Sequence, residues 1–249
     1  MAGGRKVCVW LWVICLVLGG SKAGKAADWS ITPSLETKAE YLNNIFYSPT
    51  LRKSDYILTV GPKLAFDYAS EVTKLEAALA LSGLHYFQNS NLDRINQYYS
   101  FLGNNQVTPR LGLDLKGSFI STSNPTETLV MTGILTNRQL SNILSVSPGL
   151  KYNLTERWST SLNYGFNLAN FQSQEYNNYE GHSVTHGFDF LLNEKLTLLT
   201  RLTATYYKYN SSNNSISSLG PQVGFSYKYM EKLDFMFLGG FNYSRIKTS

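Results

Sequence analysis

The sequence predicts an all-β protein, an antiparallel up-and-down transmembrane β-barrel with about 11 strands visible and 12 or more in the complete fold. Apolar and polar residues alternate through most of the chain, which is the period of a strand with two different faces. Hairpins with short turns recur along the chain. The runs of about 12 residues exceed the roughly 5–6 typical of soluble strands and suffice for the roughly 9–11 of a tilted membrane strand.

Residues 1–26 have the layout of a secretory signal peptide. Two basic residues precede an apolar run at 7–18 (VCVWLWVICLVL), and small residues follow this run up to Ala26. The apolar run has 12 residues, which is shorter than the roughly 20 that a membrane-spanning helix needs. We therefore expect export and cleavage after Ala26, with a cut after Ala23 also permitted and an uncleaved anchor helix as the alternative.

Removal of this segment changes the charge and the cysteine content. Both cysteines, Cys8 and Cys15, lie within it, as do four of the 22 Lys and Arg residues, which leaves 18 basic against 17 acidic residues. An exported chain without cysteines has no disulfide to stabilise it. The net charge of +1 gives no reason to expect a nucleic-acid partner.

A strand–turn–strand unit repeats in the second half of the chain, with Glu156, Glu194 and Glu231 in the turns. Extending this pattern to the whole chain predicts strands near 30–41, 56–68, 73–87, 94–104, 109–121, 139–153, 157–169, 181–192, 196–209, 217–229 and 233–245. Short turns alternate with longer loops rich in Asn, Ser and Tyr. Since bacterial single-chain barrels have even strand numbers, we expect the barrel at 27–249 to be incomplete at its C-terminus.

The form apolar-x-Pro-x-apolar occurs four times, around Pro33, Pro62, Pro148 and Pro221. Proline cannot donate a hydrogen bond to a β-ladder. Its regular position predicts a structural role, such as a kink or a weakly paired site.

Two architectures fit the alternation. A soluble β-sandwich would bury its apolar rows between two sheets, whereas a transmembrane barrel would turn them toward lipid and line its lumen with polar side chains. The long strands, the alternation of short turns with long loops and the aromatic residues near the ends of the apolar rows favour the barrel. Export without cysteines or a helical anchor suits a Gram-negative outer membrane.

The polar rows contain charges of both signs. By parity, the candidate lumen-lining residues are Lys63, Asp67, Glu76, Asp114, Lys116, Lys151, Asp189, Arg201, Lys228 and Asp234. These charges could pair with one another across a narrow lumen, or they could line a hydrated channel and tune which solutes pass. Both readings stay open at this point.

We predict no catalytic, cofactor-binding or metal-binding residues and no enzymatic activity. His182 and His186 share the apolar face of one strand and lie roughly 13 Å apart at about 3.3 Å per residue, so they cannot share a metal ion directly. His182 and Ser183 are adjacent and therefore face opposite sides of the strand. Aromatic residues assigned to loops, among them Tyr98, Tyr99 and Tyr179, are candidates for sugar stacking or for an interfacial girdle.

Two parts of the sequence carry a family resemblance: 31–68, which includes ITPSLETKAEYLNNIFYSP and SDYILTVGPKLAFDY, and the turn unit LTERWSTSLNYGF at 154–166. The chain resembles the outer-membrane β-barrel proteins associated with PEP-CTERM/exopolysaccharide gene clusters, of the β-barrel porin type. The resemblance implies a Gram-negative outer-membrane location and a link to polysaccharide export or cell-surface assembly. It provides no catalytic residues and no cofactor.

The implied partners are outer-membrane lipid and lipopolysaccharide, the barrel-insertion machinery, and polysaccharide or export components. The first functional hypothesis is a channel or porin-like barrel. The second is a non-conducting structural or surface-interaction barrel whose long loops bind a partner. The third is a barrel enzyme that hydrolyses lipids.

Overall fold

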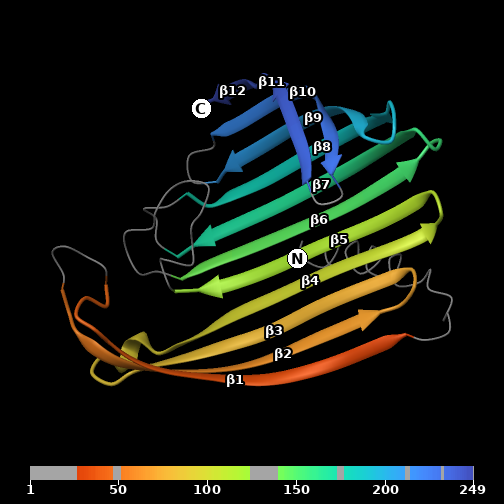
Figure 1. The fold of residues 1–249 in the computed structure, drawn as a ribbon. Coiled ribbons are helices and arrows are strands. Elements are labelled where there is room, and N and C mark those ends of the chain that lie inside the picture. Colours follow the sequence, from red (N-terminus) through yellow and green to blue (C-terminus); the bar gives the residue numbers. More distant parts are fainter. Residues whose placement is uncertain are drawn as a thin grey trace, which may run out of the picture.

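The computed structural model describes residues 27–46, 52–123, 140–172, 177–210, 214–230 and 233–248. The predicted signal peptide at 1–26, the predicted turn at Glu231 and nearly all of the predicted loop at 122–138 lie outside these residues. The described residues form one twelve-stranded antiparallel sheet (Figure 1). Its strands are β1 (Asp28–Leu42), β2 (Asp55–Ala69), β3 (Thr73–Tyr86), β4 (Arg94–Thr108), β5 (Leu111–Thr122), β6 (Ser141–Asn153), β7 (Trp158–Phe171), β8 (Tyr179–Leu191), β9 (Leu196–Tyr209), β10 (Ser215–Met230), β11 (Leu233–Gly240) and β12 (Tyr243–Lys247). A single 3-10 turn, η1 (Ser90–Leu92), precedes β4.

Strands β1 to β11 follow one another across the sheet in sequence order. This order confirms the predicted all-β class and the up-and-down topology. Most predicted strand ends agree with the observed ones within two residues. The largest difference is at β4, which continues to Thr108 through a register shift between Gln106 and Thr108. The described residues contain no helix with the length and hydrophobicity of a membrane span.

The last predicted run, 233–245, is divided into β11 and β12. Both pair with β10, since Gln222–Met230 contact β11 and Ser215–Leu219 contact β12. They therefore occupy one position in the sheet, and the twelve strands fill eleven positions. Among the described residues, no pairing joins β1 to β11 or β12, and these strands lie at opposite edges of the sheet in Figure 1.

Three prolines lie where the ladder to the following strand is interrupted. The gaps include Pro62 between β2 and β3, Pro148 between β6 and β7, and Pro221 between β10 and the β11–β12 position. Each proline is paired with a residue of the strand that precedes its own in the chain, as Pro148 is with Leu115. Because proline has no backbone N–H, these residues account for the interruptions. The predicted weakly paired sites therefore exist in β2, β6 and β10, which are four strands apart.

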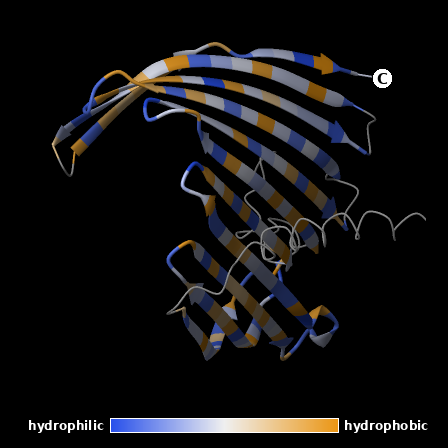
Figure 2. Cartoon of the chain, turned by 90° about the vertical axis from the view of Figure 1, so that its right-hand side faces the viewer, coloured by the Kyte–Doolittle hydropathy of each residue, from blue (hydrophilic) through white to orange (hydrophobic). Residues whose placement is uncertain are grey.

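The two faces of the sheet differ in chemistry, as the alternating stripes along the strands show (Figure 2). We call the face that carries Lys151 and Arg201 the inner face and the face that carries Leu162 and Leu202 the outer face. The strand register connects each set into rows that cross the sheet. Side chains from several strands together line hollows on the inner face.

Large apolar side chains are exposed on the outer face far from the sheet edges. Leu79 is 52% exposed, and Leu162 and Val184 are each 41% exposed. The same face continues through exposed residues of β9 and β10, including Leu198, Leu202 and Phe225. A soluble monomer rarely shows a contiguous apolar surface of this extent.

Two buried clusters lie at the end of the sheet where the longer connections are found. One contains Ala169, Phe171 and Tyr179, and the other contains Ile45, Ile57 and Tyr86. Two residues before Ile57, the buried carboxylate of Asp55 accepts hydrogen bonds from the backbone N–H groups of Gln88 and Asn89 at 3.0 and 2.9 Å. It also accepts one from the Asn89 side chain at 2.8 Å, so Asp55 holds the segment that follows β3.

Candidate functional site

The strand register places all ten predicted lumen-lining residues on the inner face. For example, Asp67 is opposite Glu76 across β2 and β3, and Lys228 is opposite Asp234 across β10 and β11. The rows of Asp114, Lys116, Lys151, Asp189 and Arg201 connect through β6 to β9 in the same way. Whether this face lines a water-filled lumen stays a prediction.

Charge pairing on this face is sparse. Arg201 and Asp189 form an ion pair, with a second contact of 3.3 Å between Nη2 and Oδ2. Among the described residues, the other eight predicted charges form no ion pair, although Ser30 Oγ donates a hydrogen bond to Asp67 at 3.4 Å. The reading in which these charges neutralise one another across a narrow lumen therefore applies to one pair only.

The centre of the inner face, across β6 to β10, is built from hydroxyl, amide and glycine residues. One row runs from Ser147 through Gly165, Ser183 and Thr205 to Ser218. The adjacent row toward the short turns runs through Gly149, Asn163, Thr185, Thr203 and Gly220. These two rows define what we call the central hydroxyl strip, a surface of small side chains that donate and accept hydrogen bonds.

Hydrogen bonds between strands order part of this strip. The Thr185 and Thr203 hydroxyls are 3.1 Å apart, and those of Thr205 and Ser218 are 2.5 Å apart. In the adjacent row toward the loops, the Ser145 hydroxyl donates to Asn167 Oδ1 at 2.8 Å. Each hydroxyl has two lone pairs and one proton, so these groups keep further hydrogen-bonding capacity for water or a solute.

Glycines allow neighbouring polar side chains to lie close to the sheet. A Cβ on Gly149 would overlap the side-chain oxygens of Asn163 and Asp114. A Cβ on Gly187 would overlap the Ser161 hydroxyl and approach Arg201 Nη1 to 3.0 Å. The glycines therefore let these side chains lean over the backbone and keep space free above the sheet.

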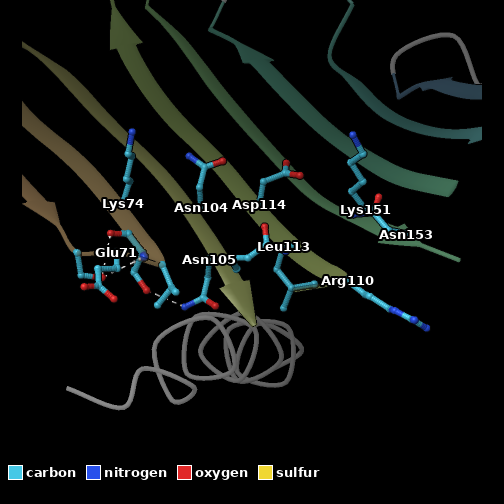
Figure 3. A pocket seen from close by; sticks show the side chains of 14 residues that line it. Glu71, Lys74, Asn104, Asn105, Arg110, Leu113, Asp114, Lys151 and Asn153 are labelled. Carbon is cyan, nitrogen blue, oxygen red and sulfur yellow. Dashed lines mark hydrogen bonds between the residues drawn. The ribbon is translucent and has the colours of Figure 1, made fainter. Parts of the chain in front are cut away.

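Charged residues line two hollows at the short-turn end of the inner face. The first, with a volume of about 390 Å³, lies across β3 to β6, and Figure 3 shows Lys74, Asn104, Asp114 and Lys151 along it. The second has a volume of about 630 Å³, lies across β6 to β11 and reaches the turn before β5. It is lined by Arg110, Lys151, Asp189 and Arg201, among other residues. This end of the face can attract charged solutes, whereas the central hydroxyl strip is uncharged.

The long-loop end of the inner face is aromatic. The Tyr179 ring lies 6.2 Å from that of Tyr207 and 6.1 Å from that of Tyr209, measured between ring centres. Tyr179 was expected in a loop, but β8 begins at Tyr179, two residues before the predicted strand at 181–192. Tyr98 and Tyr99, also named among the loop aromatics, lie within β4, in agreement with the predicted strand at 94–104. By register, Tyr98 lies on the inner face and Tyr99 on the outer face.

The histidines lie on the outer face and contact acidic or hydroxyl groups. His182 Nδ1 is 2.7 Å from the Tyr164 hydroxyl, and its Nε2 is 3.1 Å from Glu180 Oε1. His186 Nε2 is 2.9 Å from Thr160 Oγ1. In the part of the chain that the structure describes, no group of three or more His, Cys, Asp or Glu residues is placed to hold a metal ion.

Sequence reasoning found the charges of the inner face but missed the central hydroxyl strip, the tyrosine cluster and the Tyr164–His182–Glu180 chain. The strip carries the same period of two as the charges, so parity alone could have found it. The other two features depend on which residues face one another across neighbouring strands, and this pairing is set by the register.

No family model matches the chain, and no curated protein matches it. Several solved structures have a similar arrangement of strands. One is a loop L8 deletion mutant of OmpT, an outer membrane protein of Vibrio cholerae, with 7% identity, coverage of 89% of this chain and 97% of that chain, and a TM-score of 0.46. Another is the Pseudomonas putida toluene transporter TodX, with 13% identity, coverage of 88% and 73%, and a TM-score of 0.36. A third is the CymD monoaromatic hydrocarbon channel, with 10% identity, coverage of 90% and 87%, and a TM-score of 0.35. At these identities and TM-scores, the likenesses give no information on substrate or activity.

Proposed function

We propose that the chain is an outer-membrane β-barrel of the channel type, with the outer face toward lipid and the inner face toward a hydrated lumen. The observation that carries the proposal is the opposite chemistry of the two faces. Large apolar side chains are exposed across the outer face, while the centre of the inner face consists of hydroxyl, amide and glycine residues. A transmembrane barrel requires this distribution, whereas a soluble sandwich would bury the apolar face.

Single-channel recording in planar bilayers tests the proposal, and adjacent residues of β8 provide matched variants. Ser183 lies on the inner face opposite Gly165, whereas Val184 lies on the outer face opposite Tyr164. We expect Ser183→Trp to lower the conductance because the indole narrows the lumen, and we expect Val184→Trp to leave it unchanged. Folded full-length protein that inserts into the bilayer without conducting would contradict the channel.

We further propose that the solutes are hydrated and rich in hydroxyl groups, in line with polysaccharide export or cell-surface assembly. The central hydroxyl strip supports this proposal because it offers hydrogen bonds without fixed charge. Tyr207 and Tyr209, which pack against the buried Tyr179 at the long-loop end, supply partly exposed rings beside it. Maltooligosaccharides added to a conducting channel should interrupt the current, whereas equal ionic strength and viscosity without sugar should not. Uninterrupted current at every chain length would contradict this solute class.

A non-conducting barrel with a structural or surface-interaction role is the second candidate. It is favoured by the two buried clusters at the long-loop end, which fill part of the inner face with apolar side chains. The conductance measurement separates the two candidates. Neither includes an enzymatic activity, and the polar contacts of the three histidines, as described, are to Asp93, Glu180, Tyr164 and Thr160 rather than to serine.

A further inference from the structure

The larger hollow of the inner face, at the short-turn end, carries more cations than anions. The charged residues among those that line its volume of about 630 Å³ are Arg110, Lys151, Arg157 and Arg201 against Glu156 and Asp189. Asp189 is bound to Arg201. Uncharged polar side chains, such as those of Asn153 and Ser159, line the same hollow. The hollow therefore has an excess of two positive charges beside groups that form hydrogen bonds.

Two of these cations, Lys151 and Arg201, lie in one row across the sheet. The register pairs Lys151 with Ser161. It continues from Ser161 to Gly187 and from Gly187 to Arg201. A Cβ on Gly187 would stand 2.5 Å from Ser161 Oγ and 3.0 Å from Arg201 Nη1. The row therefore presents an ammonium group, a hydroxyl and a guanidinium group, and Gly187 places no side chain between the last two.

The cations of the hollow keep hydrogen-bonding capacity for a ligand. Among the described residues, Arg110, Lys151 and Arg157 form no ion pair, and all three are exposed. Arg201 donates to both carboxylate oxygens of Asp189 and, at 2.8 Å, to the Thr200 carbonyl oxygen. These bonds use three of its five N–H groups. Asp189 thus holds the guanidinium group in place, and the Arg201 side chain stays 25% exposed.

The row of Lys151 and Arg201 adjoins the central hydroxyl strip. Lys151 follows Gly149 of the strip by two residues on β6, and Arg201 precedes Thr203 by two residues on β9. Such positions face the same side of a strand and lie roughly 7 Å apart. Asp114, opposite Gly149, extends over that glycine toward Asn163 and forms no ion pair with Lys151. A ligand longer than one sugar ring can therefore contact the cations and the strip together.

We propose that Lys151, Ser161 and Arg201, which we call the cation row, bind the acidic groups of anionic oligosaccharides. The inference rests on the proposed hydrated lumen and narrows its solute class, with the sugar hydroxyls placed along the central hydroxyl strip. Hydrogen bonds from Lys and Arg to anionic oxygens are shorter and stronger than neutral ones. A cleft with an excess of one charge also raises the local concentration of the opposite ion. In the proposed barrel the short turns face the periplasm, so the cation row meets the solute at that mouth.

Binding of trigalacturonate and maltotriose to the refolded full chain in detergent, measured by isothermal titration calorimetry, tests the inference. The two sugars have the same number of rings, and only the first carries carboxylates. We expect the wild type to bind trigalacturonate more tightly and salt to weaken this binding selectively, because salt screens the charges. Inorganic phosphate carries charge without sugar rings, and it should bind more weakly than trigalacturonate.

Lys151→Gln removes a charge from the cation row, and Lys116→Gln is the matched control. Lys116 also lies on the inner face, opposite Leu102 and Ser147, and is not among the described residues that line either hollow. We expect Lys151→Gln to weaken trigalacturonate binding about tenfold, as loss of one hydrogen bond to a charged group would, and to leave maltotriose binding unchanged. Lys151→Arg should retain the binding, and Lys116→Gln should bind as the wild type does.

Three outcomes would overturn the inference: equal wild-type affinity for trigalacturonate and maltotriose, equal affinity for phosphate and trigalacturonate, or equal weakening by Lys151→Gln and Lys116→Gln. Planar-bilayer recording on the same preparation keeps the two proposals apart. A conducting protein that binds both sugars equally refutes the cation row alone. A protein that binds trigalacturonate selectively and inserts without conducting refutes the channel alone.

Discussion

Tyr207 lies over Gly181 on the inner face, across the β8–β9 pair. The two residues are register partners, and ring atoms of Tyr207 lie 2.5–3.4 Å from the place where a Cβ of residue 181 would stand. The ring therefore occupies the space that the missing side chain leaves. This contact connects the tyrosine cluster of the long-loop end to the row of Ser145 and Asn167.

The Gly181–Tyr207 contact predicts that a methyl group added at residue 181 destabilises the protein. Gly181→Ala should lower the free energy of unfolding by about 1–3 kcal/mol, because the new methyl overlaps the ring and forces it to move. Urea unfolding in detergent, followed by tryptophan fluorescence, measures the change. Gly117→Ala, which adds the same group to open space, should leave the unfolding midpoint unchanged, and an equal loss in both variants would refute the role of the contact.

The Arg201–Asp189 pair predicts how the ion selectivity of the channel changes when either of the two charges is removed. Asp189→Asn leaves the Arg201 cation without its partner on the inner face, so the channel should shift toward anions, and Arg201→Gln should shift it toward cations. Reversal potentials in a KCl gradient measure both shifts. The double variant should return close to the wild-type value, whereas shifts of the same sign in both single variants would contradict the assignment of this face to the lumen.

Pro148 predicts a weak point in the wall between β6 and β7. The ladder lacks the pairs at Ser147 and Pro148, so fewer bonds hold β7 near Tyr164 and Gly165. Hydrogen exchange should be faster for peptides covering 163–166 than for those covering 167–171 of the same strand. Pro148→Ser restores an N–H donor and should slow exchange at 163–166 selectively, and uniform exchange along β7 in both proteins would contradict the interpretation.

The hydrogen bonds of Asp55 predict that its carboxylate stabilises the segment after β3. Asp55→Asn replaces a buried charged acceptor of three hydrogen bonds and should cost about 1.5–3 kcal/mol, the range for hydrogen bonds to charged groups. Residues 87–93 should then become susceptible to limited proteolysis. Asp67→Asn is the control, because Asp67 accepts only one long bond from Ser30, and equal proteolysis of the two variants would exclude a specific role for Asp55.

Much of the fold could be predicted because the strand period is local. The alternation at 157–169 fixes which side chains share a face, and β7 has that alternation. The same parity places Lys151 and Arg201 on one face without knowledge of the neighbouring strands. The class, the order of strands and the grouping of charges therefore follow from properties of single segments.

Features that depend on neighbouring strands were not predictable in this way. The position of Pro148 was visible, but the side on which its bond is missing depends on β5 and β7. Tyr164 and His182 are 18 residues apart, and their contact requires the β7–β8 register. The break between β11 and β12 coincides with Pro221 on β10, so it too is a property of two strands together.

The two edges of the sheet share a direction, because β1 and the β11–β12 position are the first and the eleventh of an alternating series. Both run from the short turns toward the long loops. Direct contact between them would make a parallel pair in a sheet whose other pairs are antiparallel. Two copies inserted with the same orientation meet the same restriction, since β1 of one copy would be parallel to β11 of the other. An antiparallel strand pair at either edge therefore requires a strand that runs from the long-loop end toward the short turns. Association of identical copies in the same orientation does not supply such a strand.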